Sequence, residues 1–97
     1  MSRSIHRLAA LDLEEAAQYY YRQGGAVLAR RFLSEFERIA TLLEQHPGLG
    51  SPSGDGRQVF ALNDFPYSVV YRAEAAGIRI LVVRHQRRHP AHGQFRQ

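Results

Sequence analysis

The residues best able to do chemistry lie together near the C-terminus, in the run Arg84-His85-Gln86-Arg87-Arg88-His89-Pro90. The guanidinium group of arginine binds phosphate or carboxylate through two parallel hydrogen bonds. The imidazole of histidine can accept or donate a proton near neutral pH. Together these groups could bind RNA and cleave it by general acid–base catalysis, with His85 and Arg88 at the reacting atoms. The alternative interpretation is a solvated basic tail that follows the last strand.

The histidines of this region do not predict a metal site. His85, His89 and His92 would share one face of a helix, but Pro90 would break that helix. No acidic residue follows Glu74 to complete a set of ligands. We therefore expect neither a metal ion nor another cofactor.

The three consecutive tyrosines Tyr19–Tyr21 could stack on nucleic-acid bases. On a helix, however, three neighbouring side chains point in different directions, and only Tyr20 continues an apolar stripe. We expect these rings to pack within the fold.

The composition excludes several classes of chemistry. The chain has 97 residues, no cysteine and 13 basic residues, all of them arginine. Without cysteine there is no disulfide and no thiolate catalysis, and without lysine there is no Schiff base and no P-loop. The length and the 44% of hydrophobic residues indicate a single small globular domain over residues 1–97.

The net charge of +4 is concentrated in the second half of the chain. Residues 1–46 hold six arginines and six acidic residues, whereas residues 47–97 hold seven arginines and three acidic residues. This imbalance favours a partner that is acidic, either a nucleic acid or an acidic protein segment. The apolar runs are too short to cross a membrane, and no secretory signal follows Met1, so we expect no membrane partner and a cytoplasmic location.

The first half of the chain predicts a helical hairpin over about residues 9–46. Apolar residues recur at helical spacing from Leu13 to Tyr20, and Gly24-Gly25 ends this first helix. The second helix, from about Ala26 to Gln45, has an apolar stripe formed by Leu28, Phe32, Phe36, Ile39 and Leu43.

The second half predicts a loop and a small sheet. Residues 47–56 are rich in glycine, proline and serine and indicate a loop. Alternating patterns predict three antiparallel strands within about residues 57–84, namely Arg57–Leu62, Tyr67–Ala73 and Ile78–Arg84. In the third, Ile78, Ile80 and Val82 are expected to face away from Arg79, Leu81 and Val83. Ser4–Leu8 could add a short strand, and residues 85–97 form a basic tail. The fold class is α+β, with the helical hairpin packed on the sheet.

Several motifs together resemble the RelE/ParE superfamily of bacterial type II toxins, also called plasmid stabilisation proteins. They include the stretch from Ala9 to Ala16, the Pro47-Gly48-Leu49-Gly50 turn, the strand Phe65–Arg72, and the closing strand Ile80–Arg88 with its His-x-x-Arg. The resemblance covers nearly the whole chain. It implies a hairpin on a twisted antiparallel sheet, growth inhibition, and neutralisation by a co-encoded antitoxin in a hetero-oligomer.

Two branches of this superfamily imply different targets. The Phe-Pro-Tyr motif and His85-x-x-Arg88 resemble ParE toxins, which act on DNA gyrase without being nucleases. RelE toxins cut mRNA on the ribosome, and the serine at position 68 stands where they tend to carry arginine. The ParE branch is therefore favoured, with a RelE-like endoribonuclease and a non-toxic module that binds only its antitoxin as alternatives. The residues expected to bind the target are Arg57, Arg72, Arg84, His85, Arg87 and Arg88.

Overall fold

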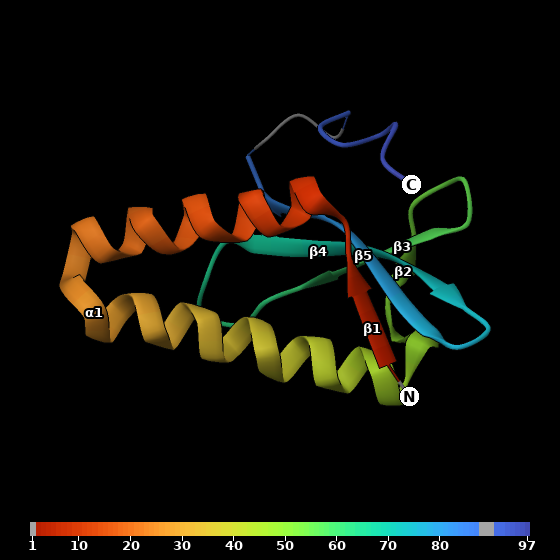
Figure 1. The fold of residues 1–97 in the computed structure, drawn as a ribbon, viewed down its shortest axis with the longest axis horizontal. Coiled ribbons are helices and arrows are strands. Elements are labelled where there is room, and N and C mark those ends of the chain that lie inside the picture. Colours follow the sequence, from red (N-terminus) through yellow and green to blue (C-terminus); the bar gives the residue numbers. More distant parts are fainter. Residues whose placement is uncertain (1, 88–90) are drawn as a thin grey trace.

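The computed structural model describes residues 2–87 and 91–97 of the chain. The elements follow in the order β1 (Ser2–Ile5), α1 (Arg7–Gln45), η1 (Pro47–Leu49), β2 (Ser51–Pro52), β3 (Arg57–Ala61), β4 (Tyr67–Glu74) and β5 (Gly77–His85). The predicted α+β class is confirmed, with α1 packed on one face of a five-stranded sheet (Figure 1). Within the residues described, no helix has the length and apolar character needed to cross a membrane.

Helix α1 is bent into two arms at the predicted glycine pair. Gly24 has φ −149° and Gly25 has φ +73°, so neither residue is helical. A positive φ is readily adopted by glycine because it lacks a Cβ atom. The arms run back along one another as a hairpin, and the second arm ends where Pro47 begins a short 3-10 turn (Figure 1).

The first arm begins with a histidine cap. The Nδ1 atom of His6 accepts a hydrogen bond from the backbone N–H of Leu8 at 3.0 Å. Burial lowers the pKa of His6 below its ordinary value of 6.5, and the positive charges of Arg79, Arg96 and Arg7 lower it further. Only the unprotonated nitrogen can accept this bond, so the fold favours the neutral imidazole.

We expect this cap to make stability depend on pH. Folding lowers the pKa of His6. The cap therefore contributes fully to the free energy of unfolding above pH 6.5, and this contribution is lost as the pH falls through the pKa of the folded state. His6→Asn keeps a capping oxygen and removes the titration, so it should lose less stability between pH 7.5 and 5.5 than the unsubstituted chain. His6→Ala should cost about 1 kcal/mol at pH 7.5. Urea denaturation at both pH values measures these stabilities. If His6→Asn lost as much stability between pH 7.5 and 5.5 as the unsubstituted chain, the prediction would be contradicted.

The sheet has the strand order β1-β5-β4-β3-β2 and is mixed. Strands β3, β4 and β5 form the predicted antiparallel meander. The N-terminal strand lies at Ser2–Ile5 rather than Ser4–Leu8 and pairs in parallel with β5, so the expectation of a wholly antiparallel sheet was wrong. The segment 47–56, predicted as a loop, contains η1 and the two-residue strand β2, which pairs with β3.

A β-bulge in β5 changes which side chains face the helices. Val70 of β4 lies opposite Val82, but the next residue, Tyr71, lies opposite Ile80, so Leu81 is the additional residue. Leu81 and Val82 therefore both belong to the cluster on the face away from α1, while Val83 packs against the helices. The predicted alternation was wrong beyond Ile80 because a bulge shifts the pattern by one residue.

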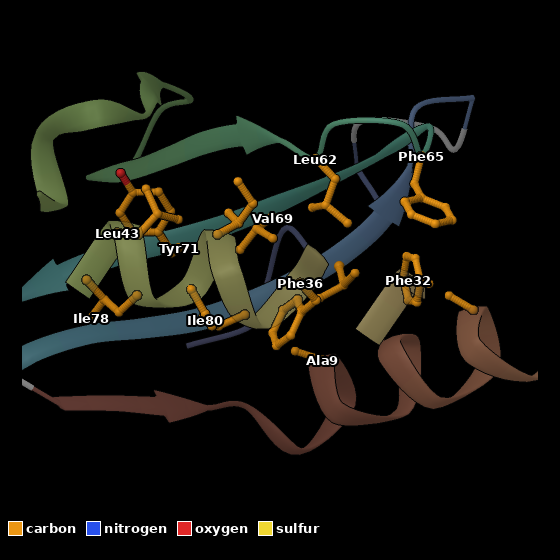
Figure 2. Packing of buried hydrophobic residues seen from close by; sticks show 14 of the residues in the cluster. Ala9, Phe32, Phe36, Leu43, Leu62, Phe65, Val69, Tyr71, Ile78 and Ile80 are labelled. Carbon is orange, nitrogen blue, oxygen red and sulfur yellow. The ribbon is translucent and has the colours of Figure 1, made fainter. Parts of the chain in front are cut away.

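The main core lies between the hairpin and the sheet (Figure 2). Its helix side is formed by the predicted stripe, in which Phe32, Phe36, Ile39 and Leu43 are almost completely buried. Tyr20 is buried as expected, and the half-exposed ring of Tyr19 packs edge to face on it, with the centroids 5.2 Å apart. Tyr21 is 60% exposed, contrary to the packing expected for it. A smaller cluster on the other face contains Val70, Leu81 and Val82, with Val59 against it.

Candidate functional site

The sheet separates the residues that the sequence assigns to target binding. Arg57 and Arg72 lie on the same face as Val59 and Val70, which is the face away from α1. Arg84 follows Val82 by two residues and lies opposite Ser68 on this same face. His85 is shifted by the bulge to the helix face, opposite Tyr67. Arg88 and His89 lie outside the described residues.

Three arginines lie side by side on neighbouring strands. Arg57 of β3 is the register partner of Arg72 of β4, and Arg72 is the partner of Arg79 of β5. Directly paired residues of antiparallel strands have Cβ atoms about 5 Å apart, and like charges at this distance repel. Glu74 is the only acidic side chain within ion-pair distance of this arginine row among the described residues, at 3.5 Å from Arg72. The row therefore holds more positive charge than the sheet itself offsets.

His85 lies at the end of β5 in a polar hollow. Its ring meets the ring of Tyr67 edge to face, with the centroids 5.2 Å apart. Its Nδ1 atom accepts a hydrogen bond from the backbone N–H of Arg87 at 3.0 Å. The hollow has a volume of about 250 Å³ and is lined on its helix side by Asp12, Glu15, Gln18, Tyr19 and Arg22. The imidazole thus lies on the helix face of the sheet, while the arginine row lies on the other face.

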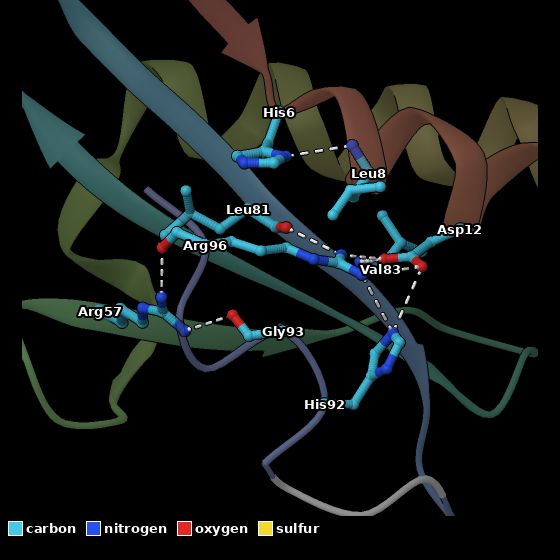
Figure 3. Close-up of polar contacts among 9 residues, drawn as sticks. All are labelled: His6, Leu8, Asp12, Arg57, Leu81, Val83, His92, Gly93 and Arg96. Carbon is cyan, nitrogen blue, oxygen red and sulfur yellow. Dashed lines mark hydrogen bonds and ion pairs between the residues drawn. The ribbon is translucent and has the colours of Figure 1, made fainter.

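The C-terminal segment, residues 91–97, is fixed to the free edge of β5 (Figure 3). Strand β1 ends at Ile5, so β5 has no strand partner on that side beyond Ile80. There the carboxylate of Asp12 accepts from the backbone N–H of Val83 at 3.1 Å, and Arg96 donates to the carbonyl of Leu81 at 3.1 Å. Arg96 also forms an ion pair with Asp12 at 2.5 Å. These two side chains thus form the hydrogen bonds with the backbone of β5 that a neighbouring strand would otherwise form.

Two arginines of the row also hold the C-terminal segment. Arg57 donates to the backbone carbonyl of Gly93 at 3.0 Å and to that of Arg96 (Figure 3). Arg79 donates to the backbone oxygen of Gln97 at 2.7 Å and to the hydroxyl of Ser4 at 3.1 Å. The C-terminal region is therefore not the solvated tail that the sequence suggested as an alternative, because its described residues return to the sheet.

The sequence did not identify Asp12, Arg79, His92 or Arg96 as members of one arrangement. His92 lies 3.3 Å from the carboxylate of Asp12, across 80 residues of sequence. Arg79 could have been found from the register of the predicted strands, since it lies opposite Arg72. Nothing in the sequence around Asp12 indicated its contact with the C-terminal segment, apart from its position in the first turns of the helix. Among the described residues, no three His, Cys, Asp or Glu side chains gather as a metal site.

The arrangement suits binding better than acid–base catalysis. A nuclease needs its proton donor or acceptor beside the groups that hold the phosphate. Here His85 lies on one face of the sheet, while Arg57, Arg72 and Arg84 lie on the other. The arginine row can instead bind carboxylates or backbone carbonyls, as Arg57 and Arg79 already do.

A family model and a solved structure each match most of the chain. The family model described as "ParE toxin of type II toxin-antitoxin system, parDE" matches residues 4–90. A solved structure of the chromosomal ParDE TA system from P. aeruginosa superposes on the chain with a TM-score of 0.79 and 27% sequence identity. The match covers 88% of this chain and 95% of that chain. No curated protein matches the chain significantly.

Proposed function

Because the chain belongs to the ParE toxin family of type II toxin–antitoxin systems, we propose that it stops growth by acting on DNA gyrase and that a co-encoded antitoxin neutralises it. The observation that carries this proposal is the family match over residues 4–90. The ParDE structure from P. aeruginosa supports it by its similarity over nearly its whole length. Gyrase acts on DNA inside the cell, so we propose that the toxin works in the cytoplasm.

The proposed contacts with gyrase lie at the open end of β5. Arg84 and His85 end β5 on opposite faces of the sheet, and Arg87 follows them with an exposed side chain. Arginine suits protein contacts because its planar group forms several hydrogen bonds at once. Arg88 was assigned to the same surface from the sequence and stays a prediction, since it lies outside the described residues.

The separation of His85 from the arginines of the other face supports this target over mRNA. A RelE-like mechanism would use His85 for proton transfer and Arg57, Arg84, Arg87 and Arg88 for the phosphate. Arg88 lies outside the described residues. In the described residues, His85 instead meets the ring of Tyr67 and lies in a hollow that Asp12, Glu15 and Arg22 also line.

Induced expression in a bacterial host tests the proposal. We expect growth to stop, cells to become filaments, and plasmid DNA to lose negative supercoiling while protein synthesis continues. Co-expression of the neighbouring antitoxin gene should restore growth. Arg87→Gln should weaken the toxic effect more than Arg30→Gln, which makes the same charge change on an exposed position of α1.

Other outcomes of this experiment would each contradict the proposal. Blocked protein synthesis with normal supercoiling, together with cuts in mRNA at ribosomal A-site codons, would establish the endoribonuclease. Normal growth on expression of a folded toxin would establish a module that binds only its antitoxin.

A further inference from the structure

Two registers of β5 against β4 are compatible with the apolar residues at the open end of β5. In the structure Leu81 is the additional residue of the bulge, so Val83 packs against the helices and Val82 lies on the other face. Without the bulge, every residue after Ile80 would move by one place, and a shift of one residue turns each side chain to the opposite face. Val82 would then replace Val83 against the helices. Because one valine takes the place of another, the core is filled in both registers.

The register decides which side chains the end of β5 presents on each face. In the bulged register, His85 lies opposite Tyr67 on the helix face, and Arg84 lies opposite Ser68 on the other face. In the regular register, Arg84 would lie opposite Tyr67, and His85 would turn to the face that carries the arginine row. The two registers therefore exchange the faces of Arg84 and His85, and a partner shaped for one register does not fit the other.

Hydrogen bonds from outside the sheet fix the backbone of β5 at the bulge (Figure 3). Arg96 donates to the carbonyl of Leu81 at 3.1 Å, and Asp12 accepts from the backbone N–H of Val83 at 3.1 Å. The two side chains also form an ion pair and are only 11% and 12% exposed. Successive residues of a strand direct their N–H and C=O groups to alternate sides, so a shift by one residue would turn both backbone groups towards β4. These hydrogen bonds therefore require the bulged register.

Gly93 adds a packing contact that requires the same register. It has φ +79°, and a Cβ atom built on it would lie 2.5 Å from a methyl group of Val82. In the regular register, Val82 would turn to the helix face and this contact would be lost. Arg57 and Arg79 hold the same C-terminal segment by its backbone oxygens. The segment thus fits the sheet closely only where the bulge places Val82.

From these contacts we propose that the C-terminal segment, residues 91–97, selects the bulged register of β5 and thereby sets the faces on which Arg84 and His85 meet the target. Gly93 and Arg96 are positioning residues, because they act through β5. The inference rests on the proposed function in one respect, since it takes the end of β5 to be the target-binding surface. A chain without these contacts populates both registers, and its apparent affinity for the target falls with the share of the bulged one.

Gly93→Ala tests the proposal, because its methyl group has no space beside Val82. The matched control is Gly54→Ala. Gly54 has φ +83°, close to the value at Gly93, and nothing lies within 4 Å of a Cβ atom built on it. Both variants therefore carry similar backbone strain, and they differ in the contact with Val82.

Nuclear Overhauser spectra of the full-length chain report the register directly. The unsubstituted chain and Gly54→Ala should show cross-peaks between the rings of Tyr67 and His85, whose centroids are 5.2 Å apart. In Gly93→Ala we expect these cross-peaks to fall about tenfold, as the regular register becomes the major one. Cross-peaks between Tyr67 and Arg84 should appear in their place. A merely structural role of the segment would lower the melting temperature and leave the pattern of cross-peaks unchanged.

A second variant keeps the glycine and removes the hydrogen bonds. Arg96→Gln loses the hydrogen bond to Leu81 and the ion pair with Asp12. We expect it to lower the cross-peaks between the two rings about fivefold, since charge-assisted hydrogen bonds are lost. Arg30→Gln is its control, because it makes the same charge change on an exposed position of α1 and should leave the cross-peaks unchanged.

The same variants separate this inference from the proposed function. Equal cross-peaks in Gly93→Ala and Gly54→Ala, or in Arg96→Gln and Arg30→Gln, would overturn the selection of the register. The toxin concentration that half-inhibits gyrase supercoiling should be about tenfold higher for Gly93→Ala than for Gly54→Ala. Equal concentrations despite the loss of the cross-peaks would overturn the role in target binding. If the unsubstituted chain does not inhibit gyrase, the proposed function fails, while the cross-peaks still decide whether the segment selects the register.

Discussion

Replacing Phe32 with alanine is expected to destabilise the fold by about 3–5 kcal/mol, the usual cost of removing a buried aromatic ring. Phe32 is completely buried where the second arm of α1 meets the sheet (Figure 2). The centroid of its ring lies 5.1 Å from the ring centroid of Tyr20, 5.3 Å from that of Phe65 and 5.2 Å from that of Tyr67. The cavity would therefore be shared by both arms of the hairpin and by the segment that leads into β4.

Equilibrium denaturation in urea measures this loss. Tyr21→Ala is the control, because Tyr21 is 60% exposed on the same helix and its replacement should change stability by less than about 0.5 kcal/mol. A cost below about 1 kcal/mol for Phe32→Ala would show that the two arms do not pack on the sheet through this cluster. The substitution should also weaken the proposed toxic effect, since Tyr67 contacts both Phe32 and His85.

Replacing Tyr71 with phenylalanine is expected to cost about 1–3 kcal/mol, although only one oxygen atom is removed. The Tyr71 hydroxyl donates to the carbonyl of Pro47 at 2.6 Å and accepts from the backbone N–H of Gly50 at 2.9 Å. Gly50 is buried, so its N–H would lose its partner without gaining water. The hydroxyl thus ties the 3-10 turn after α1 to the middle of the sheet.

Tyr21→Phe is the matched control, because it removes the same atom from an exposed side chain. Amide hydrogen exchange adds a local measurement to urea denaturation. In Tyr71→Phe, exchange at Gly50 should accelerate more than exchange within β5. Stability equal to that of Tyr21→Phe would contradict the role assigned to this hydroxyl.

Much of the fold could be predicted from the sequence because the helices and strands have regular apolar patterns. The stripe that includes Phe32, Phe36, Ile39 and Leu43 has helical spacing, and these four residues are buried against the sheet. The strands of the meander fall within two residues of their predicted bounds. Gly25 adopts the positive φ that separates the two arms.

The remaining features depend on contacts that no local pattern records. The bulge at Leu81 moves His85 to the helix face, yet both faces of β5 are apolar there, so the sequence carries no sign of the shift. Asp12 and Arg96 pair across 84 residues, and neither has a distinctive neighbourhood in the sequence. The arginines were assigned to one surface from the charge distribution and the family motifs, while their separation from His85 follows from strand register. Their assignment to target binding stays a prediction.

A supercoiling assay with purified gyrase, relaxed plasmid DNA and ATP tests the central claim most directly. With the purified toxin added, we predict that supercoiling stops and that linear DNA, released from gyrase–DNA cleavage complexes by detergent, accumulates with toxin concentration. Prior addition of the antitoxin should prevent both effects. Full supercoiling and no linear DNA at a large molar excess of folded toxin would contradict gyrase as the target.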